Sequence, residues 1–599
     1  MGLRTLTVLR DTVAAVAERT GEHIDLDHID FEDAAVYQMI AAGETEGVFQ
    51  LESAGMKRFM TELKPTCLED VIAGISLYRP GPMQQIPTYI KNKENPQQVT
   101  YSHPLLEPIL SVTYGCIVYQ EQVMQIVRSL GGYSYGRADL VRRAMAKKKA
   151  DVMEKERAHF IHGIVDENGT VTVAGALRNG VSESVANALF DEISRFAEYA
   201  FNKSHAAAYA HLAYQTAYLK HYYPKEFMAA LLTSFLGTPA KIARYVAECK
   251  RLEINVLAPH INRSGDGFVV CNEGIFFSLS GIKNVGRSFA SAIAEERRKN
   301  GPFIDLHDFC TRMDRNDCNK RALESLIRSG AMDGVGGHRA QLINGFESVY
   351  ESVHSIARRS LEGQMSFFGG EPAKNEREAL PFCPPYSEEQ LLAMEKEMTG
   401  LYFSGHPLDK FEEQLAFSGA TPTSEFADLS DGSETESMKN GSVLKVAGLV
   451  TSIKEKKTKR GDVMSFVTLD DHYGSVEILF FPKVWEECRY RMRNDVPLVI
   501  QGRLSLREDE PVTLVAESVS ELDANLPQKL YLRISEKDEH TIERILGLLK
   551  ESAGSLPVYL YYERTKTTKL TTEEYWVTPS QKLLLALKSL LGDSSVKPV

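Results

Sequence analysis

The stretch Ser475-Val476-Glu477-Ile478-Leu479-Phe480 indicates how this chain is organised. Its Val, Ile and Phe residues occupy every second position, which is the period of two that a half-buried β-strand requires. Similar stretches recur between residues 443 and 522 and predict a small β-barrel there. Residues 1–255, in contrast, have a mostly helical pattern. The change of period predicts helical domains first and a barrel after them.

The regions on either side of the barrel extend this prediction. Downstream we expect a strand at 530–534, a helix at 541–552 and a second strand at 557–562. Upstream, residues 338–362 have an amphipathic helical pattern, and a polar linker with several prolines follows at 371–385. The predicted fold class is therefore multidomain and mainly α, followed by a β-barrel and a small α+β C-terminal domain.

Length and composition exclude several classes of protein. A chain of 599 residues, 43% hydrophobic and 25% charged, is a folded protein of about three to five domains and neither disordered nor a coiled coil. Its net charge of -12 argues against a globally basic nucleic-acid binder, although local charge matters more. The eight cysteines form no Cys-x-x-Cys pair, which excludes a zinc ribbon and a disulfide framework. No signal peptide or membrane span is evident, so we expect a cytoplasmic protein with no membrane partner.

A basic segment at residues 137–157 is the first candidate binding site. Arg142 and Arg143 stand among lysines on neighbouring faces of a predicted helix, an arrangement suited to a polyphosphate. The alternative is a solvated helix in which Asp139 pairs with both arginines at helical spacing. Charge alone favours this alternative.

Two further blocks carry exposed basic residues at chain turns. In Tyr78-Arg79-Pro80-Gly81-Pro82 the prolines and the glycine stiffen the backbone around Arg79, although an ordinary helix-ending turn has the same pattern. In Phe201-Asn202-Lys203-Ser204-His205 we expect Ser204 to be the N-cap of an Ala-rich helix. A helix N-terminus flanked by Lys203 and His205 suits an anion, and a simple capped helix is equally compatible.

The segment Gly281-Ile282-Lys283-Asn284-Val285-Gly286 has the pattern of a helix-hairpin-helix turn. Glycines at both ends are expected to let the backbone turn tightly and direct its N–H groups at a DNA phosphate, without reading bases. Residues 321–339 around Gly330 resemble a degenerate second unit. Two such units in tandem favour DNA binding more than one does.

Five positive charges in seven residues mark the start of the barrel. They lie in Lys454-Glu455-Lys456-Lys457-Thr458-Lys459-Arg460, which we expect to be the first loop of an OB-fold, one of its nucleic-acid-binding loops. Phe466 on the next strand offers a stacking face. The alternative is a solvated hairpin, but the density of like charge favours nucleic acid.

A pair of aromatic residues follows the helix at 338–362. They lie in Gln364-Met365-Ser366-Phe367-Phe368, just before two glycines. Exposed paired aromatics usually insert into a partner's pocket, whereas the alternative is that they fold back onto their own domain. The glutamine and the aliphatic spacing favour the partner.

Taken together, these blocks identify a resemblance to the C-terminal half of the bacterial replicative DNA polymerase III alpha subunit, a family C polymerase. The similarity is nearly continuous from Met1 to about Leu522. Because the barrel follows the hairpins, the chain resembles the DnaE-type subgroup. Besides the blocks at 78–82 and 201–206, the resemblance rests on Gly47-Val48-Phe49-Gln50-Leu51-Glu52, Val118-Tyr119-Gln120-Glu121-Gln122, Arg142-Arg143-Ala144-Met145 and Gly405-His406-Pro407-Leu408-Asp409.

The resemblance implies a domain order. It divides the chain into a remnant of the palm (1–20), fingers (21–255), a tandem helix-hairpin-helix (256–355), a sliding-clamp-binding segment (356–370), a linker with a helical connection (371–440), an OB-fold (441–525) and a C-terminal α+β domain (526–599).

The resemblance also implies residue roles. In the fingers, Arg142 and Arg143 would face the triphosphate of the incoming nucleotide, and Arg79, Lys203 and His205 would line the same cleft. Duplex DNA would contact Lys283, Asn284 and Gly286, and the single-stranded template would lie near Lys454, Lys456, Lys457, Lys459 and Arg460. The sliding clamp would bind Gln364, Met365, Ser366, Phe367 and Phe368.

One departure from the family concerns catalysis. The resemblance implies two Mg²⁺ ions held by three palm aspartates, the third of which would fall two residues before the segment matched here by Met1 to Thr5. The aspartates Asp25, Asp27, Asp30 and Asp33 do not match that site, so no catalytic or metal-binding residue is expected in this chain. We therefore expect a truncated piece of a DNA-directed DNA polymerase, inactive alone.

Its implied partners are primer-template DNA, deoxynucleoside triphosphates, a sliding clamp, a clamp loader and other replisome subunits. The alternative function is a non-catalytic scaffold that binds DNA and the clamp.

Overall fold

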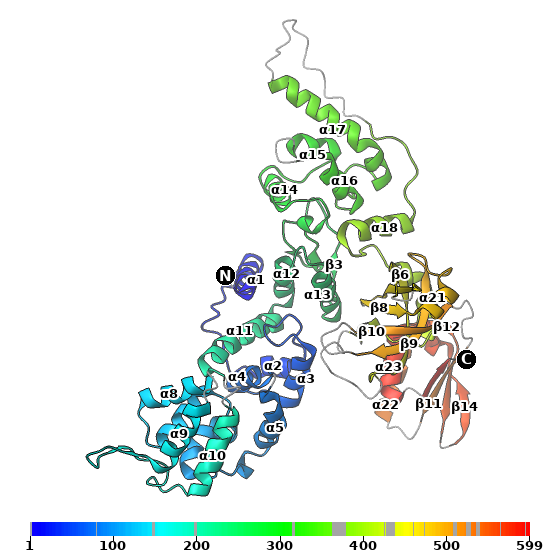
Figure 1. The fold of residues 1–599 in the computed structure, drawn as a ribbon. Coiled ribbons are helices and arrows are strands. Elements are labelled where there is room, and N and C mark those ends of the chain that lie inside the picture. Colours follow the sequence, from blue (N-terminus) through cyan, green and yellow to red (C-terminus); the bar gives the residue numbers. More distant parts are fainter. Residues whose placement is uncertain are drawn as a thin grey trace. The chain divides into compact units, whose positions relative to one another are not determined.

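The computed structural model divides the chain into two compact units, Met1–Ser234 and Phe235–Val599 (Figure 1). Within the part of the chain that the structure describes, no helix has the length and hydropathy of a membrane span. It describes residues 3–598 apart from 80, 147–149, 197–200, 314–317, 362–378, 424–425, 427–437, 459–460, 473, 507–511, 523–528, 535–538, 564 and 593–594.

The first unit is built almost wholly of helices, as predicted. Pro224 is the first residue of α12, where its missing N–H is no loss and its fixed φ suits the helix. The short antiparallel hairpin β1–β2 was not predicted. The elements are α1 (Arg4–Thr20), α2 (Ala34–Ala41), α3 (Ala54–Leu63), α4 (Leu68–Leu77), α5 (Ile86–Glu94), α6 (Glu107–Leu110), α7 (Gln120–Ser129), α8 (Tyr135–Ala146), α9 (Ala150–His162), β1 (Ile164–Val165), β2 (Val171–Val173), α10 (Glu183–Phe196), α11 (Lys203–Tyr222) and α12 (Pro224–Ser234).

Two hydrophobic cores hold this unit together. The first contains residues of α2, α3 and α4 together with the small inward face of α11, where alanines let α4 approach closely. The second contains residues of α7, α8 and α10. Since α11 packs along α4, α2 and α1, it brings segments more than a hundred residues apart into contact.

The second unit opens with the region in which helix-hairpin-helix units were predicted. Short helices follow a small three-stranded sheet, and the long α17 reproduces the predicted amphipathic helix at 338–362. The elements are α13 (Pro239–Arg251), β3 (Val256–Leu257), β4 (Val269–Val270), β5 (Ile275–Phe276), the 3₁₀-helix η5 (Leu279–Gly281), α14 (Arg287–Asn300), α15 (Leu306–Met313), α16 (Lys320–Arg328), α17 (Arg339–Leu361), α18 (Glu388–Thr399), η6 (Pro407–Phe411) and α19 (Glu412–Phe417).

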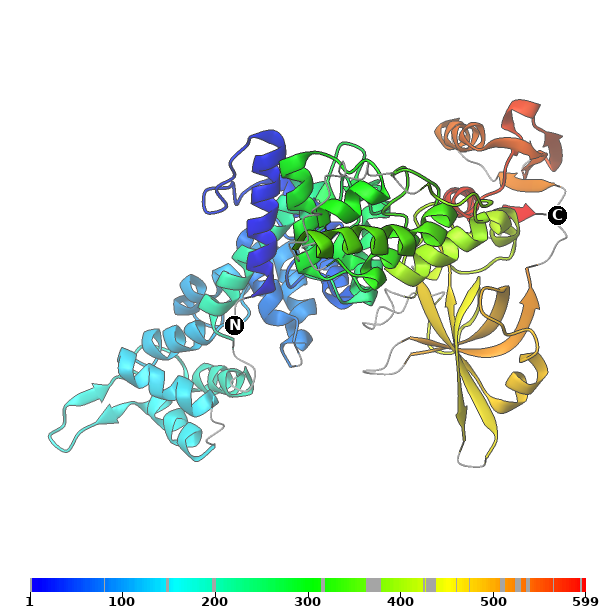
Figure 2. The same ribbon diagram turned by 90° about the horizontal axis from the view of Figure 1, so that it is seen from above.

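A closed barrel follows, with strand order β10-β8-β7-β6-β9. Its strands are the yellow and orange arrows of Figure 2. In β8 the residues Val476, Ile478 and Phe480 are buried, and their side chains join the barrel core, as the alternation predicted. The barrel consists of β6 (Val443–Lys457), β7 (Val463–Asp470), β8 (Ser475–Phe480), α21 (Pro482–Cys488), β9 (Pro497–Ser505) and β10 (Thr513–Glu521).

The C-terminal region is a small α+β domain. Strands β11 and β13 are parallel, so the chain between them crosses over through a helix, α22. The predicted fold class is thus confirmed throughout, and all eight cysteines are free. The elements are β11 (Leu530–Ile534), α22 (Glu539–Glu551), β12 (Ala553–Leu556), β13 (Val558–Tyr562), β14 (Thr567–Leu570), α23 (Gln581–Leu591) and β15 (Val596–Pro598).

Candidate functional site

Phe201 is the point at which three distant segments of the first unit meet. The guanidinium of Arg79 lies 3.8 Å from the centre of the Phe201 ring, within the range of a cation–π contact. The Phe201 ring packs edge-on against His205, with ring centres 5.4 Å apart. The backbone of Phe201 pairs with Tyr119, and its carbonyl accepts the Gln120 N–H at 2.9 Å. The structure therefore brings Arg79 and His205 to one place, where both contact Phe201.

The start of α11 differs from the sequence prediction. Ser204 was expected to cap this helix, but the N-cap is Asn202, and its side-chain oxygen accepts the His205 N–H at 2.9 Å. Asn202 lies just outside the helix in an extended conformation, which lets its short amide reach the first turn. Ser204 lies within that first turn. The expectation was wrong because Asn and Ser are about equally good N-caps, so residue type alone does not decide between Asn202 and Ser204.

Carboxylates already surround the N-terminus of α11. Glu121 accepts hydrogen bonds from the Lys203 N–H at 3.0 Å and from the Asn202 amide at 2.9 Å. The Lys203 Nζ lies 3.0 Å from the Glu69 carboxylate. A helix N-terminus favours negative charge, and here the protein's own acids supply it. An anionic ligand would therefore replace these partners.

Arg142 and Arg143 on α8 share one carboxylate. Asp139 lies 2.8 Å from Arg142 Nη2 and 2.7 Å from Arg143 Nε. The hydrogen bond from Arg142 and the charges of both arginines hold the pKa of Asp139 below its usual range. Arg142 Nη1 also donates to the Gln120 side chain at 3.4 Å, which links α8 to the segment paired with Phe201.

The pairing of Asp139 with both arginines, expected for a solvated helix, is thus present. Arg142 also contacts Gln120, whose backbone is bonded to Phe201. We call Arg79, Arg142, Arg143, Lys203 and His205 the basic junction. The neighbouring Lys147, Lys148 and Lys149 lie outside the described residues. Arg79 contacts the start of α11 through Phe201, Arg142 is linked to it through Gln120, and Arg143 joins them through the shared Asp139. Guanidinium and ammonium groups of this kind suit the oxygens of a phosphate group.

In the first hairpin of the second unit, the left-handed conformation falls on neither of the two glycines that were expected to allow the tight turn. The left-handed conformation falls on Asn284 (φ 65°), whereas Gly286 has an ordinary φ of -73°. Gly281 is required for another reason, since a Cβ there would clash with the Phe277 ring. The Asn284 side chain donates to Ser325 on α16 at 3.0 Å. Lys283 and Gly286 are exposed at the start of α14, where a phosphate can approach them.

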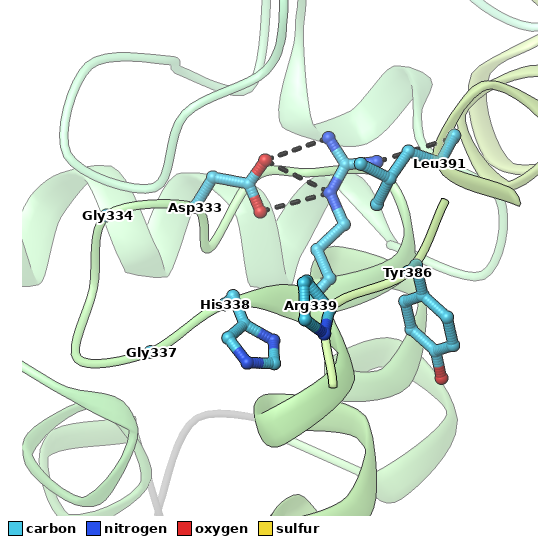
Figure 3. A pocket seen from close by; sticks show the side chains of 8 residues that line it. Asp333, Gly334, Gly337, His338, Arg339, Tyr386 and Leu391 are labelled. Carbon is cyan, nitrogen blue, oxygen red and sulfur yellow. Dashed lines mark hydrogen bonds and ion pairs between the residues drawn. The ribbon is translucent and has the colours of Figure 1, made fainter. Parts of the chain in front are cut away.

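The second hairpin is closed by buried ion pairs. Arg339, whose side chain is only 6% exposed, lies 2.8 Å from Asp333 and 2.9 Å from Glu395 on α18. Asp333 and Arg339 line a pocket of about 300 Å³ together with Gly334, Gly337, His338, Pro385, Tyr386 and Leu391 (Figure 3). Because Arg339 pairs with both Asp333 and Glu395, these charges stabilise the fold around the pocket.

The basic residues of the barrel lie mostly on a strand, not in a loop. The expected loop at 454–460 was wrong, because β6 continues to Lys457 and pairs with β7 up to that residue. Lys454 is opposite Phe466 across the ladder and Lys456 is opposite Met464, so these side chains share one face. Glu455, on the other face with Lys457, accepts a hydrogen bond from Trp485. Lys459 and Arg460 lie outside the described residues, as do Gln364, Met365, Ser366, Phe367 and Phe368.

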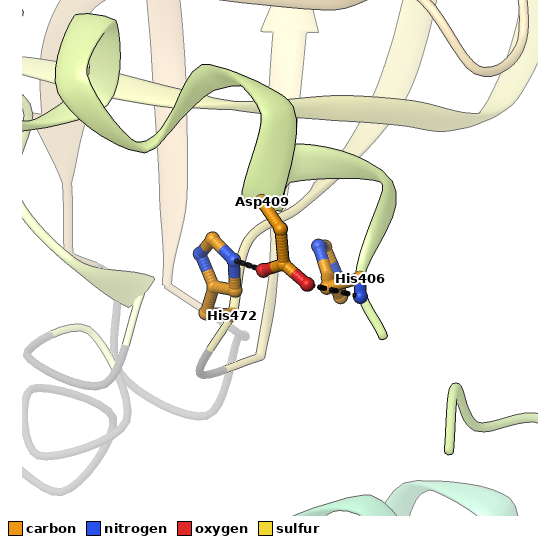
Figure 4. Close-up of side chains that lie close together, drawn as sticks. All are labelled: His406, Asp409 and His472. Atoms are coloured by element: carbon orange, nitrogen blue, oxygen red, sulfur yellow. Dashed lines mark hydrogen bonds and ion pairs between the residues drawn. The ribbon is translucent and has the colours of Figure 1, made fainter. Parts of the chain in front are cut away.

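Among the described residues, one group of three side chains has metal-ligand chemistry and spacing. It comprises His406, Asp409 and His472 (Figure 4). Burial, reinforced by the neighbouring His472, lowers the pKa of His406 to about 4, which leaves its imidazole neutral at physiological pH. No sequence signal pointed to His472, because it lies more than sixty residues from the other two.

Four family models match the chain. They describe the bacterial DNA polymerase III alpha subunit finger domain (residues 5–168), a helix-hairpin-helix motif (253–342), an OB-fold nucleic acid binding domain (444–522) and the C-terminal domain of DNA polymerase III subunit alpha (544–592). The predicted finger, hairpin and OB-fold regions are thereby confirmed as domain types.

Similar curated proteins are DNA polymerase III alpha subunits. The Thermus aquaticus protein is 40% identical over 571 residues, which cover 94% of this chain and 45% of that protein. The Bacillus subtilis (strain 168) and Escherichia coli (strain K12) proteins are 38% and 36% identical, and each match covers 100% of this chain and 52% of the relative. The chain spans about half the length of the curated relatives it matches.

Proposed function

Because this chain carries the finger and C-terminal domains of the bacterial DNA polymerase III alpha-subunit family, we propose that it is the nucleotide-, DNA- and clamp-binding portion of a replicative DNA-directed DNA polymerase. The observation that carries this proposal is the basic junction. Three separate sequence blocks supply its cations, and Phe201 and Gln120 link them.

The basic junction binds the triphosphate of the incoming deoxynucleotide. Arg142 and Arg143 release Asp139 and turn their guanidiniums to phosphate oxygens, which accept charged hydrogen bonds as well as a carboxylate does. Lys203 exchanges Glu69 for phosphate in the same way. In the absence of nucleotide, Asp139 and Glu69 keep these cations in position, so less ordering is required when the ligand binds.

The family's two Mg²⁺ ions do not fit the residues described here. The group of three with suitable spacing contains two imidazoles, whereas Mg²⁺ prefers oxygen ligands in octahedral geometry. Asp25 and Asp33 are engaged locally, Asp25 with the His28 ring and Asp33 as the N-cap of α2. We propose that the metal-binding aspartates lie in the part of the family's sequence that this chain does not span.

Primer extension tests this proposal. We expect no extension by the 599-residue chain with Mg²⁺, and extension once the remaining portion of the Bacillus subtilis relative is joined upstream. In that chimera, Arg142→Ala/Arg143→Ala should abolish synthesis. The control Arg58→Ala/Arg195→Ala, which removes two exposed arginines elsewhere in the first unit, should leave synthesis intact. Extension by the chain alone, or by the Arg142/Arg143 variant of the chimera, would contradict the proposal.

The outer face of the barrel binds single-stranded template. We expect Lys454→Gln/Lys456→Gln to weaken single-strand binding and to reduce the log–log salt slope by about 1.4, since each lost phosphate contact removes about 0.7. Fluorescence anisotropy of a labelled oligonucleotide at several salt concentrations measures both quantities. The control Lys566→Gln/Lys569→Gln removes the same charge from an exposed hairpin of the C-terminal domain. Equal slopes for the two variants would show that Lys454 and Lys456 are merely solvated.

The segment at 364–368 binds the sliding clamp through its two aromatic residues. Burial of a phenylalanine contributes about 1.5–3 kcal/mol, from which the cost of ordering the segment is subtracted. We therefore expect Phe367→Ala/Phe368→Ala to abolish detectable binding to immobilised clamp in surface plasmon resonance. DNA affinity should not change. Clamp affinity equal to that of the unmodified chain would refute the assignment.

A further inference from the structure

His406, Asp409 and His472 form a compact cluster at the edge of the barrel. One ring nitrogen of each histidine and one Asp409 oxygen lie within 4.8 Å of one another. His472 Nε2 is 2.8 Å from Asp409 Oδ1, and the two imidazole rings lie 4.5 Å apart, centre to centre (Figure 4). The Asp409 side chain is 56% exposed, so water reaches the cluster.

Packing that involves none of these three side chains holds them together. His406 is the N-cap of η6, and Asp409 belongs to the same turn. His472 follows the end of β7, in the connection to β8. Leu408 of η6 and Leu415 of α19 pack on Ala447, Leu449 and Val499 of the barrel, so the connecting segment is fixed against the strands.

The hydrogen bonds of the cluster leave suitable atoms for a metal. His406 Nδ1 accepts the Leu408 N–H at 3.2 Å, and Asp409 Oδ2 accepts the His406 N–H at 2.6 Å. These bonds fix the orientation of the ring and of the carboxylate, and they leave His406 Nε2 for coordination. Asp409 Oδ1 and His472 Nε2, now paired at 2.8 Å, coordinate once the proton between them is released to solvent. Fixed outer partners of this kind are typical of metal ligands.

We propose that His406, Asp409 and His472 bind Zn²⁺, with water at the fourth position. Two imidazoles and one carboxylate are zinc ligands, with metal–ligand distances of about 2.0–2.2 Å, which place tetrahedral ligand atoms ~3.3 Å apart. The His472–Asp409 separation opens by about half an ångström to reach that value, a side-chain adjustment alone. The ion would tie η6 to the β7–β8 connection. This site does not depend on the proposed polymerase function.

Zn²⁺ titration of the full chain, freed of metal with a chelator, tests the site. Isothermal titration calorimetry should give about one equivalent, and Co²⁺ should give visible absorption without a thiolate charge-transfer band. Each of His406→Gln, Asp409→Asn and His472→Gln should weaken Zn²⁺ binding at least about tenfold. The matched control is His28→Gln, because the His28 ring also lies 2.8 Å from an aspartate, Asp25, but among the described residues it belongs to no group of three possible metal ligands. It should bind Zn²⁺ as the unmodified chain does.

Three results would overturn the proposal. They are the absence of binding by the unmodified chain, equal affinity in all three ligand variants, and a thiolate band with Co²⁺, which would place the metal on cysteines. Circular dichroism confirms that each variant keeps its barrel. If one variant fails to fold, the other two decide the question, since they remove different ligands.

Discussion

Glu395→Ala should destabilise the region around α16, α17 and α18 by about 3–5 kcal/mol, which is the usual cost of removing one partner of a buried ion pair. Glu395 is fully buried, and its carboxylate accepts hydrogen bonds from the Phe403 and Ser404 N–H groups at 3.0 and 3.1 Å and from the Ser404 hydroxyl at 2.5 Å. It also pairs with Arg339 at 2.9 Å. Truncation leaves all these donors without that acceptor in a buried site.

Hydrogen–deuterium exchange of peptides from α16–α18 measures this effect locally. If the free energy of opening this region falls by about 3 kcal/mol or more, its amides should exchange at least ~100-fold faster. The control is Glu389→Ala on the same helix, because Glu389 pairs with Lys410 at the surface, where its side chain is 78% exposed. We expect the α16–α18 peptides of Glu389→Ala to exchange at the same rate as those of the unmodified chain. Equal exchange of both variants would show that the buried pair contributes nothing.

The same carboxylate predicts a pH dependence. Burial alone would raise the pKa of Glu395, but the Ser404 hydroxyl, the Phe403 N–H and Arg339 together hold it below its usual value. A carboxyl whose pKa is lower in the folded state stabilises the fold above its unfolded pKa, about 4.3, and loses that contribution as the pH falls through the folded pKa. Exchange of α16–α18, taken relative to the intrinsic amide rate at each pH, should therefore increase below about pH 4 more in the unmodified chain than in Glu395→Ala.

Arg142→Ala/Arg143→Ala should weaken binding of a deoxynucleoside triphosphate by about 100-fold. Each arginine is expected to make a charged hydrogen bond to phosphate, worth about 1.5–3 kcal/mol, and the lower value for both gives the factor stated. Isothermal titration calorimetry on the 599-residue chain provides the measurement. Raising the salt concentration should weaken nucleotide binding by the unmodified chain more than binding by the variant, because ionic contacts are screened.

The controls separate charge from shape. Arg142→Lys/Arg143→Lys keeps the charge but loses the forked geometry, so its affinity should be intermediate. Arg58→Ala/Arg195→Ala should not affect nucleotide binding. Unchanged affinity in Arg142→Ala/Arg143→Ala would mean that these arginines serve only to pair with Asp139.

Local sequence was sufficient to predict which segments form helices and which form strands, and in what order the domains follow one another. The alternation in β8, the helix that opens at Pro224 and the amphipathic pattern of α17 each depend on residues within a few positions of one another. Periodicity and capping are short-range properties, so the chain displays them before it folds. The ordered motif blocks carried the resemblance to the polymerase family in the same way.

Tertiary structure decided how the functional residues meet. Packing of α11 along α4 sets Arg79 against Phe201, and strand pairing extends β6 through Lys457 where a loop was expected. The tertiary fold also places His472 beside Asp409, sixty-three residues away in the sequence. Such contacts depend on which buried faces pack together across long stretches of chain. No local pattern records that choice, because the free energy that fixes it comes from the core as a whole.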